Sequence, residues 1–125
     1  MLGNKDVQAT AAVKSLERAR PFYEGVLGLT PLPGEQPGVQ GYRAGNSTVL
    51  VYESEFAGTN RATTLTWSLG QDFDAVVKAL KAKGVAFERY DLPNVTMDGD
   101  VHVWGDTRVA WFKDPDGNII NIGNY

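Results

Sequence analysis

The stretch WFKDPDGNIINIGNY, from Trp111 to Tyr125, has the pattern of two strands joined by a tight turn. Pro115 presets φ for that turn, and Gly117 and Asn118 are residue types that tolerate a positive φ. An earlier turn sequence, AGN at 44–46, also stands just before a β-branched, strand-like run. Both turns are therefore predicted to be hairpin connections that lead into the last strand of a half of the chain.

The segments before these turns repeat along the chain. The same interval, 56 residues, separates Val13 from Leu69, where predicted first strands end, and Gly28 from Gly84, where predicted helices end. A repeat in register indicates an internal duplication.

Each half begins with a strand and continues with a helix. The predicted strands span Val7–Val13 and Thr63–Leu69. Ser15 and Asp72 are expected to cap the helices that follow, and Pro21 is expected to kink or delay the first helix because it lacks an amide proton. On the helix that follows Asp72, an apolar stripe predicts a buried side; it consists of Phe73, Val76, Val77 and Leu80.

Strand-like runs follow each helix in place of further helices. They are Tyr42–Ala44 and Thr48–Glu53 in the first half, and Val85–Tyr90, Arg108–Phe112 and Ile119–Ile122 in the second. We therefore predict an α+β fold of two tandem βαβββ modules, at about 5–56 and 61–125, within a single domain spanning 1–125. Sheets covered by helices on one face only are expected to form a curved mixed sheet around a cleft.

The composition limits the possible partners. The 125 residues carry a formal charge of −3 without long runs of one sign, which argues against a nucleic-acid partner. The chain has no cysteine, and no apolar window is long enough to span a bilayer. We expect a cytoplasmic protein with no membrane partner.

Three segments in order resemble the vicinal oxygen chelate superfamily, which includes glyoxalase I, bleomycin-resistance proteins and extradiol dioxygenases. These are VKSLERARPFYEGVLGL, AVVKALKAKGV and AWFKDPDGNIINI. The resemblance implies paired βαβββ modules, a homodimer and a divalent metal held by one residue from the first and one from the last strand of each half. In glyoxalase-like members these ligands are His or Gln paired with Glu.

Carried over to this chain, the ligand positions fall on Gln8, Glu53, Thr64 and Asn121. A hydroxyl and an amide in the second half supply neither negative charge nor an imidazole, which Zn²⁺, Ni²⁺ and Fe²⁺ sites require. We therefore expect no metal and no other cofactor.

The remaining candidates line the expected cleft or its rim. Alternation places Gln8 and Thr10 on one strand face and Thr64 and Thr66 on the corresponding face of the repeat, so that neutral groups would bind a polar small molecule. The expected ligand-binding set is Gln8, Thr10, Glu53, Thr64, Thr66, His102, Trp104 and Asn121.

Three of these residues have open alternatives. Glu53 shares a strand face with Val49 and Val51 and either points into the cleft, as a candidate catalytic base, or turns to solvent. His102, the only histidine, is predicted to be a partly exposed loop residue in preference to a pocket or proton-transfer residue. Trp104 is expected either at the rim of a pocket for planar ligands or in ordinary packing.

These observations favour metal-independent binding of a small organic molecule, in the manner of bleomycin-resistance-like proteins. The alternative is a glyoxalase-like lyase or isomerase that acts on a small carbonyl compound, with Glu53 moving a proton and neutral donors stabilising the enolate. The sequence leaves open whether the protein is an enzyme.

Overall fold

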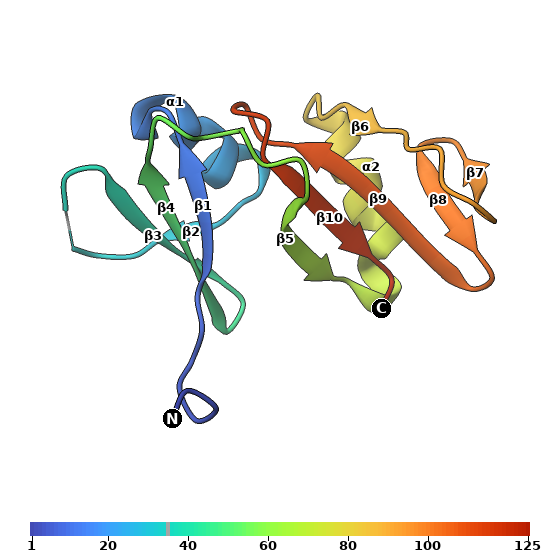
Figure 1. Cartoon of the computed structure of the whole chain (residues 1–125). Coiled ribbons are helices and arrows are strands. Elements are labelled where there is room, and N and C mark those ends of the chain that lie inside the picture. The colour runs from blue at the N-terminus through green and yellow to red at the C-terminus, as the bar shows by residue number, and fades with distance from the viewer. Residues whose placement is uncertain (35) are drawn as a thin grey trace. The chain divides into compact units, whose positions relative to one another are not determined.

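The computed structural model describes residues 1–34 and 36–125, which form two compact units, Met1–Ala57 and Gly58–Tyr125 (Figure 1). The fold is mixed α+β, and each unit contains its own sheet. In both sheets the first strand of the unit pairs in parallel with the last strand, so the two units repeat the same topology.

The first unit has the predicted βαβββ order. Its four-stranded sheet is ordered β1-β4-β3-β2, and every pairing except that of β1 with β4 is antiparallel. The short β2, which pairs with Tyr42 and Arg43 near the end of β3, completes the module. The elements are β1 (Ala9–Val13), α1 (Leu16–Arg20), a π-helix (Pro21–Val26), β2 (Thr30–Pro31), β3 (Val39–Ala44) and β4 (Ser47–Glu53).

The first helix follows the sequence prediction and adds a detail to it. Ser15 is the N-cap, where its Oγ accepts a hydrogen bond from the Arg18 amide at 3.3 Å. At Pro21 the α-helix gives way to the π-helix, because proline has no amide proton for the regular ladder. The helical segment ends before Gly28, which adopts a φ of 73° that glycine tolerates well.

The second unit contains the predicted strands and two further ones. Its six-stranded sheet is ordered β5-β10-β9-β8-β7, and β6 also pairs with β9. The 3₁₀ turn Gly70–Asp72 leads directly into the second helix. The elements are β5 (Thr63–Ser68), α2 (Phe73–Ala82), β6 (Phe87–Glu88), β7 (Thr96–Asp98), β8 (Val101–Trp104), β9 (Thr107–Lys113) and β10 (Ile119–Gly123).

The helix α2 buries the predicted stripe through Phe73, Val77 and Leu80, with Val76 half-buried. Asp72 stands at the N-cap position, but among the described residues its side chain makes no capping hydrogen bond. Gly84, with a φ of 87°, follows the end of this helix as Gly28 follows the first.

The loop expected around His102 is a hairpin instead. Strands β7 and β8 pair in antiparallel register across a turn in which Gly99 has a φ of 62°. Because the turn residues Gly99 and Asp100 are flanked by polar and apolar residues in alternation, the segment satisfies the period of a strand despite its charge. The predicted strand Val85–Tyr90 shortens correspondingly to the two residues of β6.

Candidate functional site

The second sheet has two different faces, which the strand register separates. Arg108 contacts Phe73 and Asp74 of α2, so the alternate residues of β9 that accompany Arg108 face the helix. We call the opposite side of this sheet the distal face. Cα pairing places on it Thr66, Val109, Trp111, Asn121, His102 and Trp104.

Asn121 lies in the middle of the distal face and is only 5% exposed. Its Nδ2 donates to the carbonyl oxygen of Ala110 at 3.1 Å, and its Oδ1 accepts a hydrogen bond from the hydroxyl of Tyr125. Both polar ends of this amide are therefore used inside the second unit. Burial raises the pKa of Tyr125, so its hydroxyl keeps the proton that it donates.

Gly123 makes the Tyr125 contact possible. It lies two residues after Asn121 on the same strand face, and a Cβ at this position would overlap the Tyr125 ring. Sequence reasoning did not identify Tyr125 as a site residue. A glycine two residues from both a polar strand residue and an aromatic residue is the signal that indicates such a fold-back.

His102 is fully buried on β8, so the prediction of a partly exposed loop histidine is wrong. Its Nε2 accepts a hydrogen bond from the backbone amide of Tyr90 at 2.9 Å. The imidazole packs edge-on against Trp111, with ring centroids 4.9 Å apart, and Tyr90 packs on the same indole at 5.3 Å. Burial, followed by the nearby charge of Glu88, raises the pKa of Tyr90.

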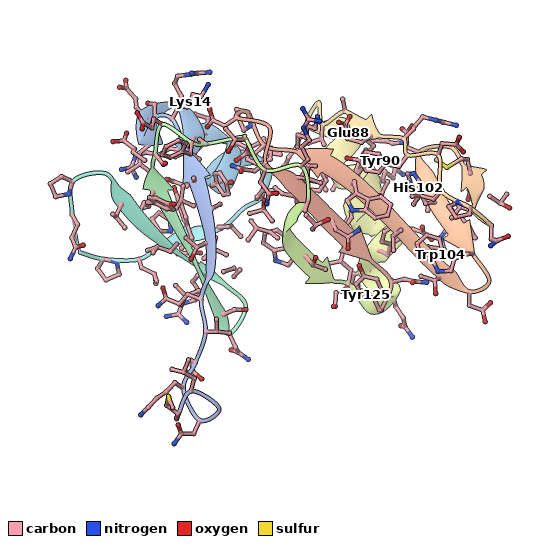
Figure 2. The ribbon with its side chains drawn as sticks, in the orientation of Figure 1. Lys14, Glu88, Tyr90, His102, Trp104 and Tyr125 are labelled. Carbon is pink, nitrogen blue, oxygen red and sulfur yellow. The ribbon has the colours of Figure 1, made fainter. Side chains whose placement is uncertain are left out.

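Trp104 ends β8 and lines a cavity of about 320 Å³. The other walls come from the segment between β6 and β7, and the indole is 40% exposed. Figure 2 shows Tyr90, His102 and Trp104 on the same side of the second unit. A mostly apolar cavity beside a partly exposed indole suits a planar ligand. The walls contributed by the segment are Leu92, Pro93, Asn94 and Val95.

The strand β4 turns Glu53 toward α1. Val13 and Glu53 are Cα partners in the parallel pair of β1 and β4, so Glu53 points to the helix-facing side of the first sheet, where it is exposed at the end of β4. Its Oε2 accepts a hydrogen bond from the Leu16 amide, in the first turn of α1, at 2.9 Å. The sequence leaves two orientations open for Glu53, and the structure shows the exposed one: the carboxylate lies at the end of the strand on the helix-facing side, because residues paired across a parallel ladder point the same way.

The other predicted residues of the first unit, Gln8 and Thr10, are exposed as well. Thr10 lies on β1 with its side chain on the face opposite Glu53, and Gln8 precedes the strand. In the second unit, Thr66 is the Cα partner of Asn121, and Thr64 is half-buried on the same strand. The structure therefore brings Thr66 and Asn121 together and separates Glu53 from Thr10.

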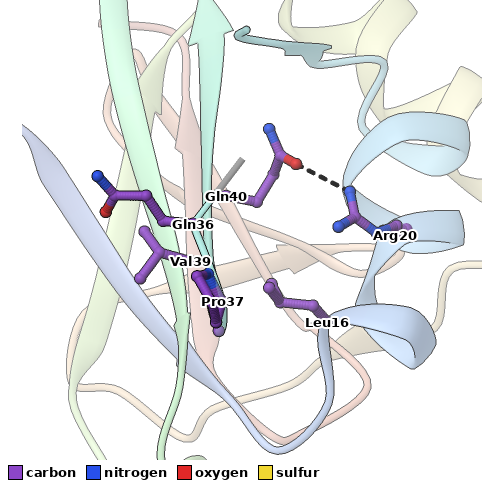
Figure 3. Close-up of a pocket in the computed structure, with 7 residues that line it drawn as sticks. Leu16, Arg20, Gln36, Pro37, Val39 and Gln40 are labelled. Atoms are coloured by element: carbon purple, nitrogen blue, oxygen red, sulfur yellow. Dashed lines mark hydrogen bonds between the residues drawn. The ribbon is translucent and has the colours of Figure 1, made fainter. Parts of the chain in front are cut away.

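The largest cavity described, about 610 Å³, lies between α1 and β3 in the first unit (Figure 3). Arg20 crosses it, and its Nη1 donates to the Oε1 of Gln40 at 2.9 Å. None of the predicted site residues lines this cavity.

The donor set of the second unit does not suit the divalent metal that the superfamily implies. Thr64 offers a neutral hydroxyl, and both polar atoms of Asn121 already bond within the protein. Within residues 1–34 and 36–125, no three His, Asp or Glu side chains form a group that could hold a metal ion. Neutral oxygens without a carboxylate or imidazole bind such ions weakly.

Across the same residues, no helix is long and apolar enough to cross a membrane.

Solved structures of similar fold come from several bacteria. FosX, a fosfomycin resistance protein from Listeria monocytogenes, matches with a TM-score of 0.73 and 15% identity, covering 99% of this chain and 92% of its own. A glyoxalase/dioxygenase from Nostoc punctiforme matches with a TM-score of 0.69 and 19% identity, covering 98% and 92%. Lactoylglutathione lyase from Agrobacterium tumefaciens matches with a TM-score of 0.67 and 16% identity, covering 96% and 92%. At these identities the similarity concerns the fold.

None of the curated proteins matches this chain. The family model described as Glyoxalase/Bleomycin resistance protein/Dioxygenase superfamily matches residues 7–122. With the parallel pairing of first and last strands in both units, this match places the chain in the glyoxalase/bleomycin resistance protein/dioxygenase superfamily, as the sequence resemblance predicted.

Proposed function

We propose that this protein binds a small organic molecule on the distal face of its second sheet and needs no divalent metal to do so. One observation carries the proposal: Asn121, at a position expected to provide a metal ligand, is a buried amide whose oxygen and nitrogen both bond inside the protein. The Tyr125 bond occupies one of the two lone pairs of the amide oxygen, and the remaining neutral lone pair is a weak donor for such a cation.

Aromatic rings around this amide support a ligand that is bound through shape and hydrogen bonds. Trp111 is the Cα partner of Asn121, and His102 and Tyr90 pack against the indole of Trp111. Trp104 adds a partly exposed indole at a cavity of about 320 Å³, which is at the small end of ligand pockets. Flat rings of this kind favour a planar or aromatic molecule.

The glyoxalase-like lyase receives less support. Its proposed base, Glu53, faces α1, and one carboxylate oxygen accepts the Leu16 amide. A general base has to reach the proton that it removes, within hydrogen-bonding distance or through one water. Glu53 also belongs to the first unit, whereas the ligand is proposed to bind to the sheet of the second unit.

Metal analysis together with a thermal-shift screen tests the proposal. We expect the purified protein to contain substoichiometric Zn, Ni and Fe, and to be stabilised by at least one planar organic molecule in the presence of EDTA. Stoichiometric metal, with turnover of a carbonyl compound that EDTA abolishes, would favour the lyase instead. The cytoplasmic location and the homodimer remain predictions from composition and resemblance.

A further inference from the structure

Two buried polar atoms on the distal face have no hydrogen-bond partner within residues 1–34 and 36–125. They are the hydroxyl oxygen of Tyr90 and the Nδ1 of His102. Buried polar groups in folded proteins are nearly always paired, so two unpaired atoms in neighbouring side chains require an explanation. The two ring centroids are 6.1 Å apart, and both rings pack on Trp111.

The hydrogen bond at the other imidazole nitrogen fixes what Nδ1 can offer. Because Nε2 accepts the Tyr90 amide proton, it needs a free lone pair, and the single proton of the neutral ring must then reside on Nδ1. The unpaired atom of His102 is therefore an N–H donor. The Tyr90 hydroxyl is a donor as well, and burial raises its pKa, which keeps it protonated.

The segment that carries Tyr90 also forms the walls of the Trp104 cavity. Residues 89–95 join β6 to β7 without regular structure, and Leu92, Pro93, Asn94 and Val95 line the cavity. Asn94 has a φ of 62°, a conformation that is uncommon for a residue other than glycine. His102 and Trp104 are two residues apart on β8, so they lie on the same face with their Cα atoms about 7 Å apart.

We propose that the Tyr90 hydroxyl and the His102 Nδ1–H recognise a carbonyl oxygen of a planar small molecule whose ring occupies the Trp104 cavity. This inference rests on the proposed function and names the chemical class of its ligand. A ketone or amide oxygen fits two neutral donors, and Glu88, the carboxylate whose charge acts on Tyr90, is already paired with Lys113 at 3.0 Å. Since both donors are buried, residues 89–95 have to move when the molecule enters.

The ligand-free protein tests the first half of this inference. His102 is the only histidine, so its imidazole ¹⁵N signals need no assignment, and we expect the Nδ1–H tautomer. We also expect Tyr90→Phe to leave the melting temperature unchanged or to raise it, because the substitution removes an unpaired buried hydroxyl. Tyr125→Phe is the matched control and should lower the melting temperature, because that hydroxyl is bonded to Asn121. An Nε2–H tautomer, or a Tyr90→Phe protein as destabilised as Tyr125→Phe, would overturn the inference.

A pair of probes that differ by one carbonyl tests the second half. We expect 1-indanone to bind about tenfold more tightly than indane, and Tyr90→Phe to reduce that preference without weakening indane. Equal affinity for the two probes would overturn the carbonyl assignment while the proposed function stands. If neither probe binds, that result also counts against the carbonyl assignment. If no compound in the wider thermal-shift screen binds, that result counts against the proposed function.

Discussion

Replacing Asn121 by aspartate exchanges one NH₂ group for an oxygen and leaves the shape of the side chain almost unchanged. In the native protein that NH₂ donates to the Ala110 carbonyl at 3.1 Å, inside a site that is only 5% exposed. The substitution places a carboxylate oxygen against a carbonyl oxygen, while the bond from the Tyr125 hydroxyl is retained. The introduced carboxyl group therefore favours its protonated form, which can donate to Ala110.

The size of the effect follows from the lost hydrogen bond. Burial and the facing carbonyl should raise the pKa of the introduced carboxyl group above its unfolded value, and the unpaired carboxylate oxygen should cost about 1–3 kcal/mol at pH 7. A group whose pKa is raised on folding supports stability below its unfolded pKa and loses that support as the pH rises through the folded value. Asn121→Asp should therefore be much less destabilising near pH 4 than at pH 7.

Urea unfolding followed by tryptophan fluorescence measures this difference. All three tryptophans, Trp67, Trp104 and Trp111, belong to the second unit, so the signal reports on the unit that contains the substitution. Asn60→Asp is the control, because it makes the same chemical change at an exposed loop residue of the second unit and should change stability by less than about 0.5 kcal/mol. If Asn121→Asp matched this control at pH 7, Asn121 would not be the buried, fully bonded amide described above.

Three further predictions concern other contacts. Gly123→Ala should displace the Tyr125 ring and cost about 1–3 kcal/mol of unfolding free energy. Adding Tyr125→Phe should cost little more, because both substitutions remove the same hydrogen bond, from the Tyr125 hydroxyl to Asn121. A double-mutant cycle in urea would contradict this if the two costs were additive. In thermal unfolding, Gly58→Ala should be far more destabilising than Gly105→Ala. Both glycines have a positive φ, but only at position 58 would a Cβ overlap a backbone oxygen of the β9–β10 turn. Equal effects of the two substitutions would contradict that packing. Burial, with a hydrogen bond to a neighbouring carboxylate, raises the pKa of Tyr42. The unfolded tyrosine therefore ionises first, and the free energy of unfolding should fall as the pH rises above about 10. Tyr42→Phe should make this fall less steep, and an unchanged slope would contradict the prediction.

The repeat could be predicted from the sequence because its signals are local. Ser15 supplies a cap within the next turn, and Gly28 and Gly84 permit the positive φ that follows a helix. Such preferences act within a few residues, so one sequence is enough to detect them. The sequence did not reveal the β7–β8 hairpin, because its charged residues obscure the alternation of polar and apolar side chains that is typical of a strand.

The orientation of the site residues depended on pairing between distant segments. Glu53 does share a face with Val49 and Val51, as alternation predicts. Which face that is follows from the pairing of Glu53 with Val13, forty residues earlier in the chain, and the sequence contains no local signal for that register. The hydrogen bond to the His102 imidazole similarly comes from Tyr90, which lies on a segment without regular structure.

The most direct test of the central claim is the affinity for a small molecule with and without a divalent metal. Isothermal titration of the compound that gives the largest thermal shift should be carried out once in EDTA and once with Zn²⁺. We expect the same dissociation constant in both titrations, because the buried amide and the aromatic rings of the distal face offer the ligand neutral contacts only. Binding that disappears in EDTA and returns with Zn²⁺ would contradict the account.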